Sequence, residues 1–416
     1  MSTIPPHFSK NWICAQIGAR EHYAIPRTLY AHGKLKRLYT DFWATSAWRG
    51  IGRIAGQSGL VTRYHSDLQG APVSSFNVVS MSDNCRKYGN SYERFLHDGE
   101  AFGSRVRAAL NVRNTSIDPR LVFFGYDTGF LEPAVWVRER GGKTIVCQID
   151  PSRFETDLVR AEELRWQGWS KTQPVIPEAY FHRREEEWET ADLVMVNSEW
   201  SRQALVRQGV DSAKIVVVPL AYETGNPRAK NENDWSLRTD SCFTRARPLR
   251  VLFLGQVILR KGIQYLIEAA RMLKEEPIRF DVVGAIGISD EAMDSAPHSM
   301  TFHGAVSRDQ TENFYENSDL FVFPTLSDGF GLTQLEAMAR GLPVIATPSC
   351  GEVVTDRLDG LIVPPGDANA LAEAMQLILQ DPSSLREMST AALGKVSQFG
   401  FDRLASNLGN IGDRLG

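Results

Sequence analysis

The chain has 416 residues, more than one hydrophobic core usually serves, so we expect two domains. Its composition, 43% hydrophobic and 23% charged, is that of a globular protein, and the net charge of −4 argues against general nucleic-acid binding. No apolar run reaches the roughly 20 residues that cross a bilayer, and the first residues lack the apolar core of a signal peptide. The five scattered cysteines fit no complete disulfide set, so we expect a cytoplasmic protein, with attachment to the inner face of the membrane left open.

Short apolar runs alternate with longer amphipathic stretches, which is typical of βαβ units with a parallel sheet. Buried strands are expected in the first half at 12–17, 121–126, 144–149, 193–198 and 215–220. In the second half they are expected at 250–255, 279–284, 300–304, 320–325, 343–347 and 360–365. Helices are expected between these at 261–275, 307–317, 332–340 and 367–380.

The pattern predicts an α/β fold of two doubly wound, Rossmann-like domains that face an interdomain cleft. The segment 221–249 is polar and aperiodic, so we interpret it as a linker between domains at 1–220 and 250–398. We expect residues 399–416 to form a helix that packs back on the N-terminal domain. Parallel sheets bind ligands at the carboxyl ends of their strands, so the cleft is the expected site.

The stretch SDGFGLTQLEAMARGLPVI (327–345) has the pattern of a loop, a helix and a buried strand. Its loop glycines carry no Cβ, so a ligand can lie close to the main chain, and the first helix amides favour a phosphate or a polarised hydroxyl. Each of its two spaced carboxylates can accept hydrogen bonds from two sugar or ribose hydroxyls. The alternative is an ordinary helix start with acidic residues near it. The binding interpretation selects Asp328, Gly329, Phe330, Gly331, Leu332 and Glu336.

A second motif, RVLFLGQVILRKGIQYLIEAA (250–270), has a strand ending at Gly255 and then two cations, Arg260 and Lys261, that open an amphipathic helix. Arginine binds phosphate as a planar fork and lysine as a point charge, so the pair suits a diphosphate. The alternative is two solvated side chains in a first turn. The helix dipole does not favour cations there, which favours the binding interpretation.

These two motifs, together with ADLVMVNSEWSRQAL (191–205), resemble glycosyltransferase family four, whose members are retaining, nucleotide-sugar-dependent enzymes of the GT-B fold. The resemblance is closest over 250–380, weaker over 191–220 and weakest before that. It implies that the C-terminal domain binds the nucleotide sugar and that the N-terminal domain lies on the acceptor side.

The resemblance also implies roles for single residues. Arg260 and Lys261 would hold the donor diphosphate and stabilise the leaving group, and Glu336 would hold the ribose hydroxyls. Asp328 would contact the transferred sugar, helped by amides around Phe330 and Gly331. The family usually has glutamate where this chain has Asp328, so its reach to the sugar, and with it the donor preference, stays open.

Two positions in the N-terminal half have competing interpretations. In AQIGAREHY (15–23), Gly18 resembles a family loop glycine near the phosphates, but it could be an ordinary turn residue; His22 beside it is more often a packed or surface group. In TIVCQIDPSR (144–153), Gln148 and Asp150 stand where many relatives have a histidine near the sugar. Asp150 could bind an acceptor or donor hydroxyl, or it could cap the turn before Pro151.

The resemblance implies a retaining hexosyltransferase that moves a sugar from a UDP- or GDP-type donor to a glycan or lipid-linked hydroxyl in cell-surface polysaccharide or glycolipid assembly. It implies front-face substitution with no metal and no cofactor, and no motif here has metal-ligand spacing. Alternatives on the same fold are a nucleotide-sugar epimerase, a phosphorylase or a silent sugar-nucleotide-binding subunit.

Two charged segments remain. Residues 34–63 combine six Lys and Arg side chains with aromatic residues, which suits peripheral contact with an anionic membrane; the alternative is that the aromatic side chains pack inward. The run REEEWE (184–189) is interpreted as a solvated helix face.

Overall fold

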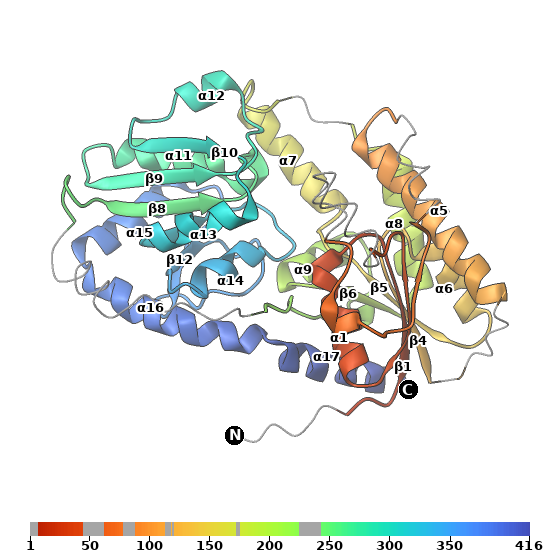
Figure 1. Cartoon of the computed structure of the whole chain (residues 1–416). Helices are drawn as coiled ribbons and strands as arrows, with labels where there is room; N and C mark the ends of the chain where they lie inside the picture. Colours follow the sequence, from red (N-terminus) through yellow and green to blue (C-terminus); the bar gives the residue numbers. More distant parts are fainter. Residues whose placement is uncertain are drawn as a thin grey trace.

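The computed structural model describes residues 7–44, 62–77, 88–112, 118, 120–171, 175–223 and 243–416. The chain forms two α/β halves, each built around a parallel sheet with helices on both faces (Figure 1). The N-terminal sheet has the order β3-β2-β1-β4-β5-β6-β7, and the C-terminal sheet has the order β10-β9-β8-β11-β12-β13. In each sheet the strand order reverses next to its first strand, which is the doubly wound arrangement that leaves a crevice at the carboxyl ends. The predicted fold class is confirmed.

The N-terminal sheet contains all five strands that the sequence predicts for this half, with two further strands at its edge. Its strands are β1 Asn11–Gln16, β2 Leu35–Thr40, β3 Val73–Ser75, β4 Leu121–Tyr126, β5 Lys143–Cys147, β6 Leu193–Val196 and β7 Ile215–Val217. Its helices are α1 Ala24–Ala31, α5 Ser91–Val112, α6 Leu131–Arg138, α7 Arg153–Arg165, α8 Glu178–Thr190 and α9 Glu199–Arg207, with short 3-10 turns η1 Arg20–Tyr23, η2 Ser66–Leu68 and η3 Ser212–Lys214.

Strand β2 corrects part of the membrane interpretation of residues 34–63. Tyr39 and Phe42 are buried, and Tyr39 stacks on Phe76, so these aromatic side chains pack inward. Trp43 packs against Tyr23 and Tyr64. Residues 45–61 of the segment, including Trp48, Arg49 and Arg53, lie outside the described residues. In the part of the chain that the structure describes, no helix has both the length and the apolar character needed to cross a membrane.

The interpretation of the run 184–189 as a solvated helix face is wrong, because half of these residues of α8 are buried. Arg184, Glu187 and Trp188 are buried. The carboxylate of Glu187 accepts hydrogen bonds from the amides of Thr128 (2.7 Å) and Phe130 (3.1 Å). Burial raises the pKa of Glu187 to about 8 against the lowering effect of the Arg183 charge and these amides. This acidic helix therefore supports the loop after β4.

The C-terminal sheet contains all six predicted strands: β8 Leu249–Leu254, β9 Ile278–Val283, β10 Met300–Gly304, β11 Leu320–Phe323, β12 Val344–Ala346 and β13 Gly360–Ile362. The central strands β11 and β12 are fully buried and therefore appear in the sequence as continuous apolar runs, whereas β9 and the edge strands β10 and β13 also carry exposed or half-buried residues. The turns and helices between and after them are η4 Leu259–Lys261, α11 Ile263–Met272, α12 Asp290–Asp294, α13 Arg308–Asn317, α14 Leu332–Met338, α15 Ala368–Gln380, α16 Ser383–Val396 and η5 Ser397–Phe399.

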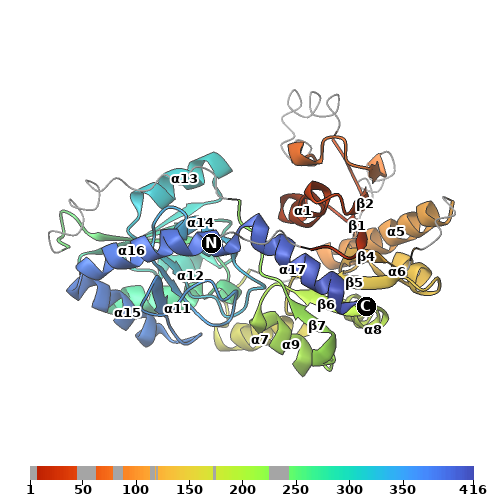
Figure 2. The same ribbon diagram turned by 90° about the horizontal axis from the view of Figure 1, so that it is seen from below.

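The last helix, α17 Phe401–Arg414, crosses to the N-terminal half and lies along α1 (Figure 2). Leu404, Leu408 and Ile411 belong to the same buried cluster as Trp12 and Leu29. Burying each such leucine or isoleucine contributes about 1.5–3 kcal/mol relative to exposure, so the end of the chain is part of the N-terminal core. Residues 224–242 of the expected linker lie outside the described residues.

Candidate active site

A cavity of about 450 Å³ lies between the two halves, where the carboxyl ends of both sheets meet. The C-terminal half provides the end of β8, turn η4 and the loop into α14, and the N-terminal half provides η1 and the loops after β5 and β6. Of the residues that the sequence selects, this cavity is lined by Gly255, Arg260, Lys261, Asp328, Phe330, Gly331 and Leu332. Two motifs about 70 positions apart in the sequence therefore meet in one site.

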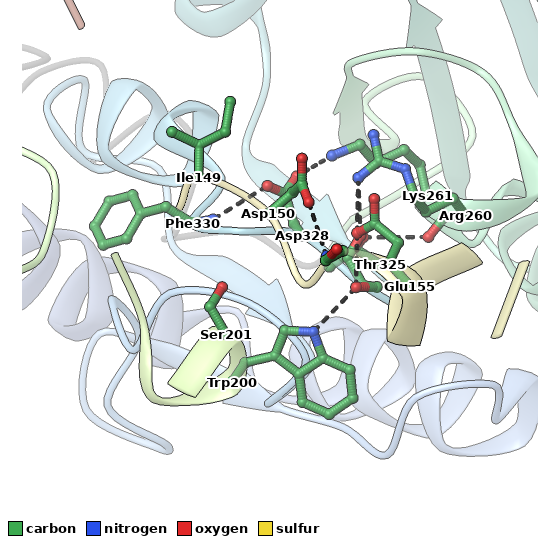
Figure 3. A network of polar contacts seen from close by, with 12 residues as sticks. Ile149, Asp150, Glu155, Trp200, Ser201, Arg260, Lys261, Thr325, Asp328 and Phe330 are labelled. Atoms are coloured by element: carbon green, nitrogen blue, oxygen red, sulfur yellow. Dashed lines mark hydrogen bonds and ion pairs between the residues drawn. The ribbon is translucent and has the colours of Figure 1, made fainter. Parts of the chain in front are cut away.

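Lys261 and Asp328 form an ion pair in the cavity (Figure 3). Both side chains are mostly buried, with 12% and 17% of their surfaces exposed. Burial and the neighbouring charge of Arg260 lower the pKa of Lys261 to about 7, while the carboxylate of Glu155 acts in the opposite direction. A diphosphate that binds Lys261 must share it with Asp328 or displace that carboxylate.

Arg260 is held by groups from both halves of the molecule. Its Nη1 donates to Glu155 Oε2 at 3.3 Å (Figure 3). The same nitrogen donates to the carbonyl oxygen of Ser327 at 3.2 Å. Within the described residues, Nε and Nη2 of Arg260 make no hydrogen bond. The guanidinium lines the cavity, so it keeps donors that can bind an oxyanion as a fork.

A chain of hydrogen bonds continues from Arg260 into the N-terminal half. Ser327 Oγ donates to Glu155 Oε2 at 2.7 Å and accepts from Trp200 Nε1 at 3.0 Å. Glu155 stands in the first turn of α7 and Trp200 in the first turn of α9. Burial raises the pKa of Glu155, and the Arg260 charge opposes that shift. Neither residue is among those selected from the sequence; the available signal was their position just after two predicted strands, 144–149 and 193–198.

Gly329 and Gly331, in the loop before α14, allow close packing because they lack a side chain. A Cβ on Gly329 would lie 2.0 Å from the carbonyl oxygen of Ile149, so Gly329 lets the two halves touch. Gly331 has a φ of +82°, which favours glycine, and a Cβ there would lie 2.6 Å from the Phe323 ring. A Cβ on Gly255, in contrast, would meet no atom within 4 Å, so the end of β8 leaves room in the cavity.

Helix α14 begins at Leu332 and is seven residues long. The Phe330 amide, which the sequence analysis selects as a ligand donor, donates to Asp328 Oδ1 at 3.1 Å. Glu336, one turn into the helix, lies outside the cavity lining and accepts a hydrogen bond from the Tyr315 hydroxyl at 2.9 Å. Both groups are therefore engaged within the C-terminal half in this conformation.

Asp150, whose side chain is 33% exposed, belongs to an ionic cluster whose other members, Arg184 and Asp127, are buried. Arg184 binds both of its carboxylate oxygens, at 3.0 and 2.9 Å, and binds Asp127 at 2.5 Å. The Ser152 amide donates to Asp150 Oδ1 at 2.8 Å, as a turn cap does. Burial opposes ionisation of Asp150, but the Arg184 charge, these hydrogen bonds and Arg260 outweigh it, so its pKa lies below the usual range. Gln148 is buried and donates to Asp150 at 3.2 Å.

Gly18 lies outside the cavity lining. Its amide donates to Asp41 Oδ1 at 2.8 Å, and its carbonyl oxygen accepts from Gln16 at 2.9 Å. The residues after it reach the cavity instead: Arg20 and Glu21 line it, and burial raises the pKa of Glu21 to about 7. Glu21, His22 and Tyr23 all have positive φ values near 50–60°, which is strained backbone for residues other than glycine.

His22 touches the other half of the molecule rather than the cavity. Its Nε2 lies 3.2 Å from Arg308 Nη1, at the start of α13. Burial lowers the pKa of His22, and the Arg308 charge acts in the same direction. Among the described residues, no group of three or more His, Cys, Asp and Glu side chains has the arrangement of a metal site.

Comparison with known proteins identifies a family for part of the chain. Residues 248–381 match the sequence model described as "Glycosyl transferases group 1". The C-terminal half carries a group 1 glycosyltransferase domain. This stretch contains the cationic pair, the Asp328 loop and Glu336, so the resemblance that the sequence suggests is confirmed for this domain.

Two relatives show how far the sequence similarity extends. A D-inositol 3-phosphate glycosyltransferase of Arthrobacter is 29% identical over 177 residues, which cover 39% of this chain and 41% of the relative. An O-antigen chain mannosyltransferase B of Escherichia coli is 29% identical over 231 residues, which cover 52% and 59%. The chain thus spans about half the length of the relatives that it matches.

Two solved structures show the fold over nearly the whole chain. Anabaena HepE, crystallised with UDP, superposes with a TM-score of 0.60 at 15% identity and covers 97% of this chain and 99% of its own. Sucrose-phosphate synthase of Thermosynechococcus elongatus gives 0.65 at 19% identity, covering 98% and 99%. The group 1 domain is therefore one half of a GT-B fold.

Proposed function

We propose that this protein is a retaining, metal-independent glycosyltransferase that takes a hexose from a nucleoside-diphosphate sugar. The observation that carries the proposal is the placement of Arg260 and Lys261 beside the Asp328 loop in the interdomain cavity. A diphosphate requires cationic hydrogen-bond donors, and Arg260 and Lys261 provide two cations. Within the described residues, Nε and Nη2 of Arg260 make no hydrogen bond, so they are available to the ligand. The UDP in Anabaena HepE supports a nucleotide ligand for this fold.

In the proposed reaction, the acceptor hydroxyl attacks the anomeric carbon from the face that the phosphate leaves. The bond between that carbon and the β-phosphate oxygen breaks, and the hydroxyl proton passes to the departing phosphate oxygen. Negative charge grows on the diphosphate, and Arg260 and Lys261 stabilise it electrostatically without a metal. Asp328 would orient the sugar hydroxyls, because a carboxylate accepts from two of them at once.

The acceptor is proposed to be a glycan or lipid-linked hydroxyl that enters from the N-terminal side of the cavity. Arg20, Glu21 and Ile149 line that side. The O-antigen chain mannosyltransferase B and an amylovoran biosynthesis glycosyltransferase of Erwinia amylovora, 26% identical over 222 residues, support a role in polysaccharide assembly. Peripheral contact of the basic side chains of residues 34–63 with an anionic membrane, at the cytoplasmic face, stays part of the proposal, without Tyr39 and Phe42, which pack inward.

A thermal-shift screen of UDP-, GDP- and ADP-sugars tests the donor assignment, because a ligand that binds only the folded state raises the Tm. Lys261→Ala should reduce the shift of any hit, while Lys274→Ala, which removes an exposed lysine of the same domain, should leave it unchanged. Incubating the hit with acceptor, and following the anomeric proton by NMR, checks retention. A screen without any nucleotide hit, or equal shifts in both variants, would contradict the assignment.

A further inference from the structure

Glu155 is an anion from the N-terminal half that binds the donor-side arginine of the other half. It stands in the first turn of α7, and its Oε2 accepts from Arg260 Nη1 (3.3 Å) and from Ser327 Oγ (2.7 Å), both in the C-terminal half. Its side chain is 17% exposed and that of Arg260 is 22% exposed, so solvent screens their interaction only in part. Glu155 is absent from the cavity lining, whereas Arg260 is part of it.

The contact leaves Arg260 neutralised before any ligand arrives. A diphosphate brings at least two negative charges to the same guanidinium, and Glu155 then lies beside a second anion. Like charges at such short range, in a partly buried site, repel by far more than in water. Ligand binding must therefore weaken the Glu155–Arg260 pair, and ligand release allows it to form again.

We propose that Glu155 is a positioning residue that stands in for the diphosphate on Arg260. It holds the guanidinium in place across the cleft while the site is empty and competes for it when the nucleotide is bound. Glu155 thereby weakens the binding of the nucleoside-diphosphate product and favours its release. This inference rests on the proposed function, because it requires a diphosphate at Arg260.

A second carboxylate on the same helix provides the matched control. Glu162 also crosses to the C-terminal half, where its Oε2 accepts from Gln264 Nε2 (3.0 Å) and from the Tyr265 hydroxyl (2.8 Å). It contacts neither Arg260 nor Lys261. A role limited to joining the two halves would make Glu155 and Glu162 equivalent, whereas competition for Arg260 would set Glu155 apart.

The experiment measures binding of inorganic pyrophosphate and of UDP and GDP by isothermal titration calorimetry. Glu155→Gln keeps the size of the side chain and an oxygen that accepts from Ser327, but removes the charge. We expect it to tighten pyrophosphate and the preferred nucleotide about tenfold, while Glu162→Gln changes neither Kd by more than about twofold. In an Arg260→Gln background, Glu155→Gln should lose most of its effect, because it acts through Arg260.

Steady-state kinetics provide a second measurement. If Glu155 only joined the two halves, its replacement would not lower the inhibition constant of the nucleoside-diphosphate product. Glu155→Gln should lower the inhibition constant of the nucleoside diphosphate, since product leaves more slowly, and kcat should fall with it where release of that product limits turnover. Unchanged or weaker binding in Glu155→Gln, or equal tightening with and without Arg260, would overturn the inference while leaving the proposed function intact. If the parent protein binds neither pyrophosphate nor any nucleotide, the proposed function and this inference fall together.

Discussion

Gly329 and Ile149 bring the backbones of the two halves into direct contact. A Cβ on Gly329 would lie 2.0 Å from the Ile149 carbonyl oxygen, a distance that real Cβ atoms essentially never show. The same oxygen accepts a hydrogen bond from Asn197 Nδ2 at 3.0 Å. Both partners of Gly329 belong to the N-terminal half, so the loop that carries Asp328 fits against that half only because residue 329 lacks a side chain.

Gly329→Ala should therefore force the two halves apart at the site. We expect kcat/KM to fall about 10- to 100-fold, because a displacement of about 1 Å is enough to cost that much when groups from both sides must meet. The matched control is Gly394→Ala in α16, where a Cβ meets no atom within 4 Å and helix propensity favours alanine by up to about 1 kcal/mol. Full activity in Gly329→Ala would show that the halves need not approach this closely.

Nucleotide binding should take up protons because of Lys261. In the free protein, burial and the Arg260 charge lower its pKa to about 7, so the side chain is partly neutral just above neutral pH. A bound diphosphate favours the ammonium and raises that pKa, so affinity should weaken as the pH rises from about 7 to 9. Calorimetry in two buffers of different ionisation enthalpy measures the uptake. The Lys261→Arg variant, whose side chain stays charged, should bind the nucleotide without taking up protons.

The lowered pKa of Lys261 also predicts how the stability of the ligand-free protein changes with pH. Between pH 7 and the ordinary lysine pKa of 10.5, the unfolded chain holds a proton that folded Lys261 has lost. Stability of the ligand-free protein should therefore rise with pH through this window, and Lys261→Met should remove that part of the slope. Chemical unfolding at several pH values measures it, and an unchanged slope would mean that Lys261 stays charged in the fold.

Asp328 should affect transfer and nucleotide binding in opposite directions. Its carboxylate pairs with Lys261 in the empty site, so Asp328→Asn frees that cation for the diphosphate. We expect the variant to bind the nucleoside diphosphate at least as tightly as the parent, while transfer falls about 100-fold through loss of the sugar contact. Separate measurement of the Kd and kcat tests this. Weaker nucleotide binding would mean that Asp328 supports the cationic pair instead of competing for it.

The C-terminal half could be predicted almost completely from the sequence, for a physical reason. Its central strands β8, β11 and β12 are largely buried, so each is mostly a short apolar run, and its two motifs follow β8 and β11, which are neighbours in the sheet. The N-terminal half is harder because β2 carries Lys36 and Arg37 among buried residues, and its charges obscured the strand. The contacts of Glu155 and Trp200 could not be predicted, since they depend on how the two sheets face each other.

Glu336 should discriminate nucleotides by their ribose hydroxyls, although Tyr315 occupies it at 2.9 Å in the empty site. Hydrogen bonds to a charged group contribute about 1.5–3 kcal/mol each, so removing both hydroxyls from the preferred nucleotide should weaken parent binding by at least about tenfold. In Glu336→Gln that penalty should shrink, because the acceptor is no longer charged. Titrating the nucleotide and its 2′,3′-dideoxy form against both proteins measures the penalty.

Tyr315→Phe separates this role from a structural one. The substitution removes the hydroxyl that engages Glu336 and keeps the buried ring, which packs near Phe321. If the carboxylate turns to the ribose when nucleotide binds, the variant should bind the ribonucleotide as tightly as the parent or up to about threefold tighter, since one competing hydrogen bond is gone. Should Glu336 only fasten α14 to α13, both variants would lower the Tm and the penalty for the dideoxy nucleotide would stay at its parent value.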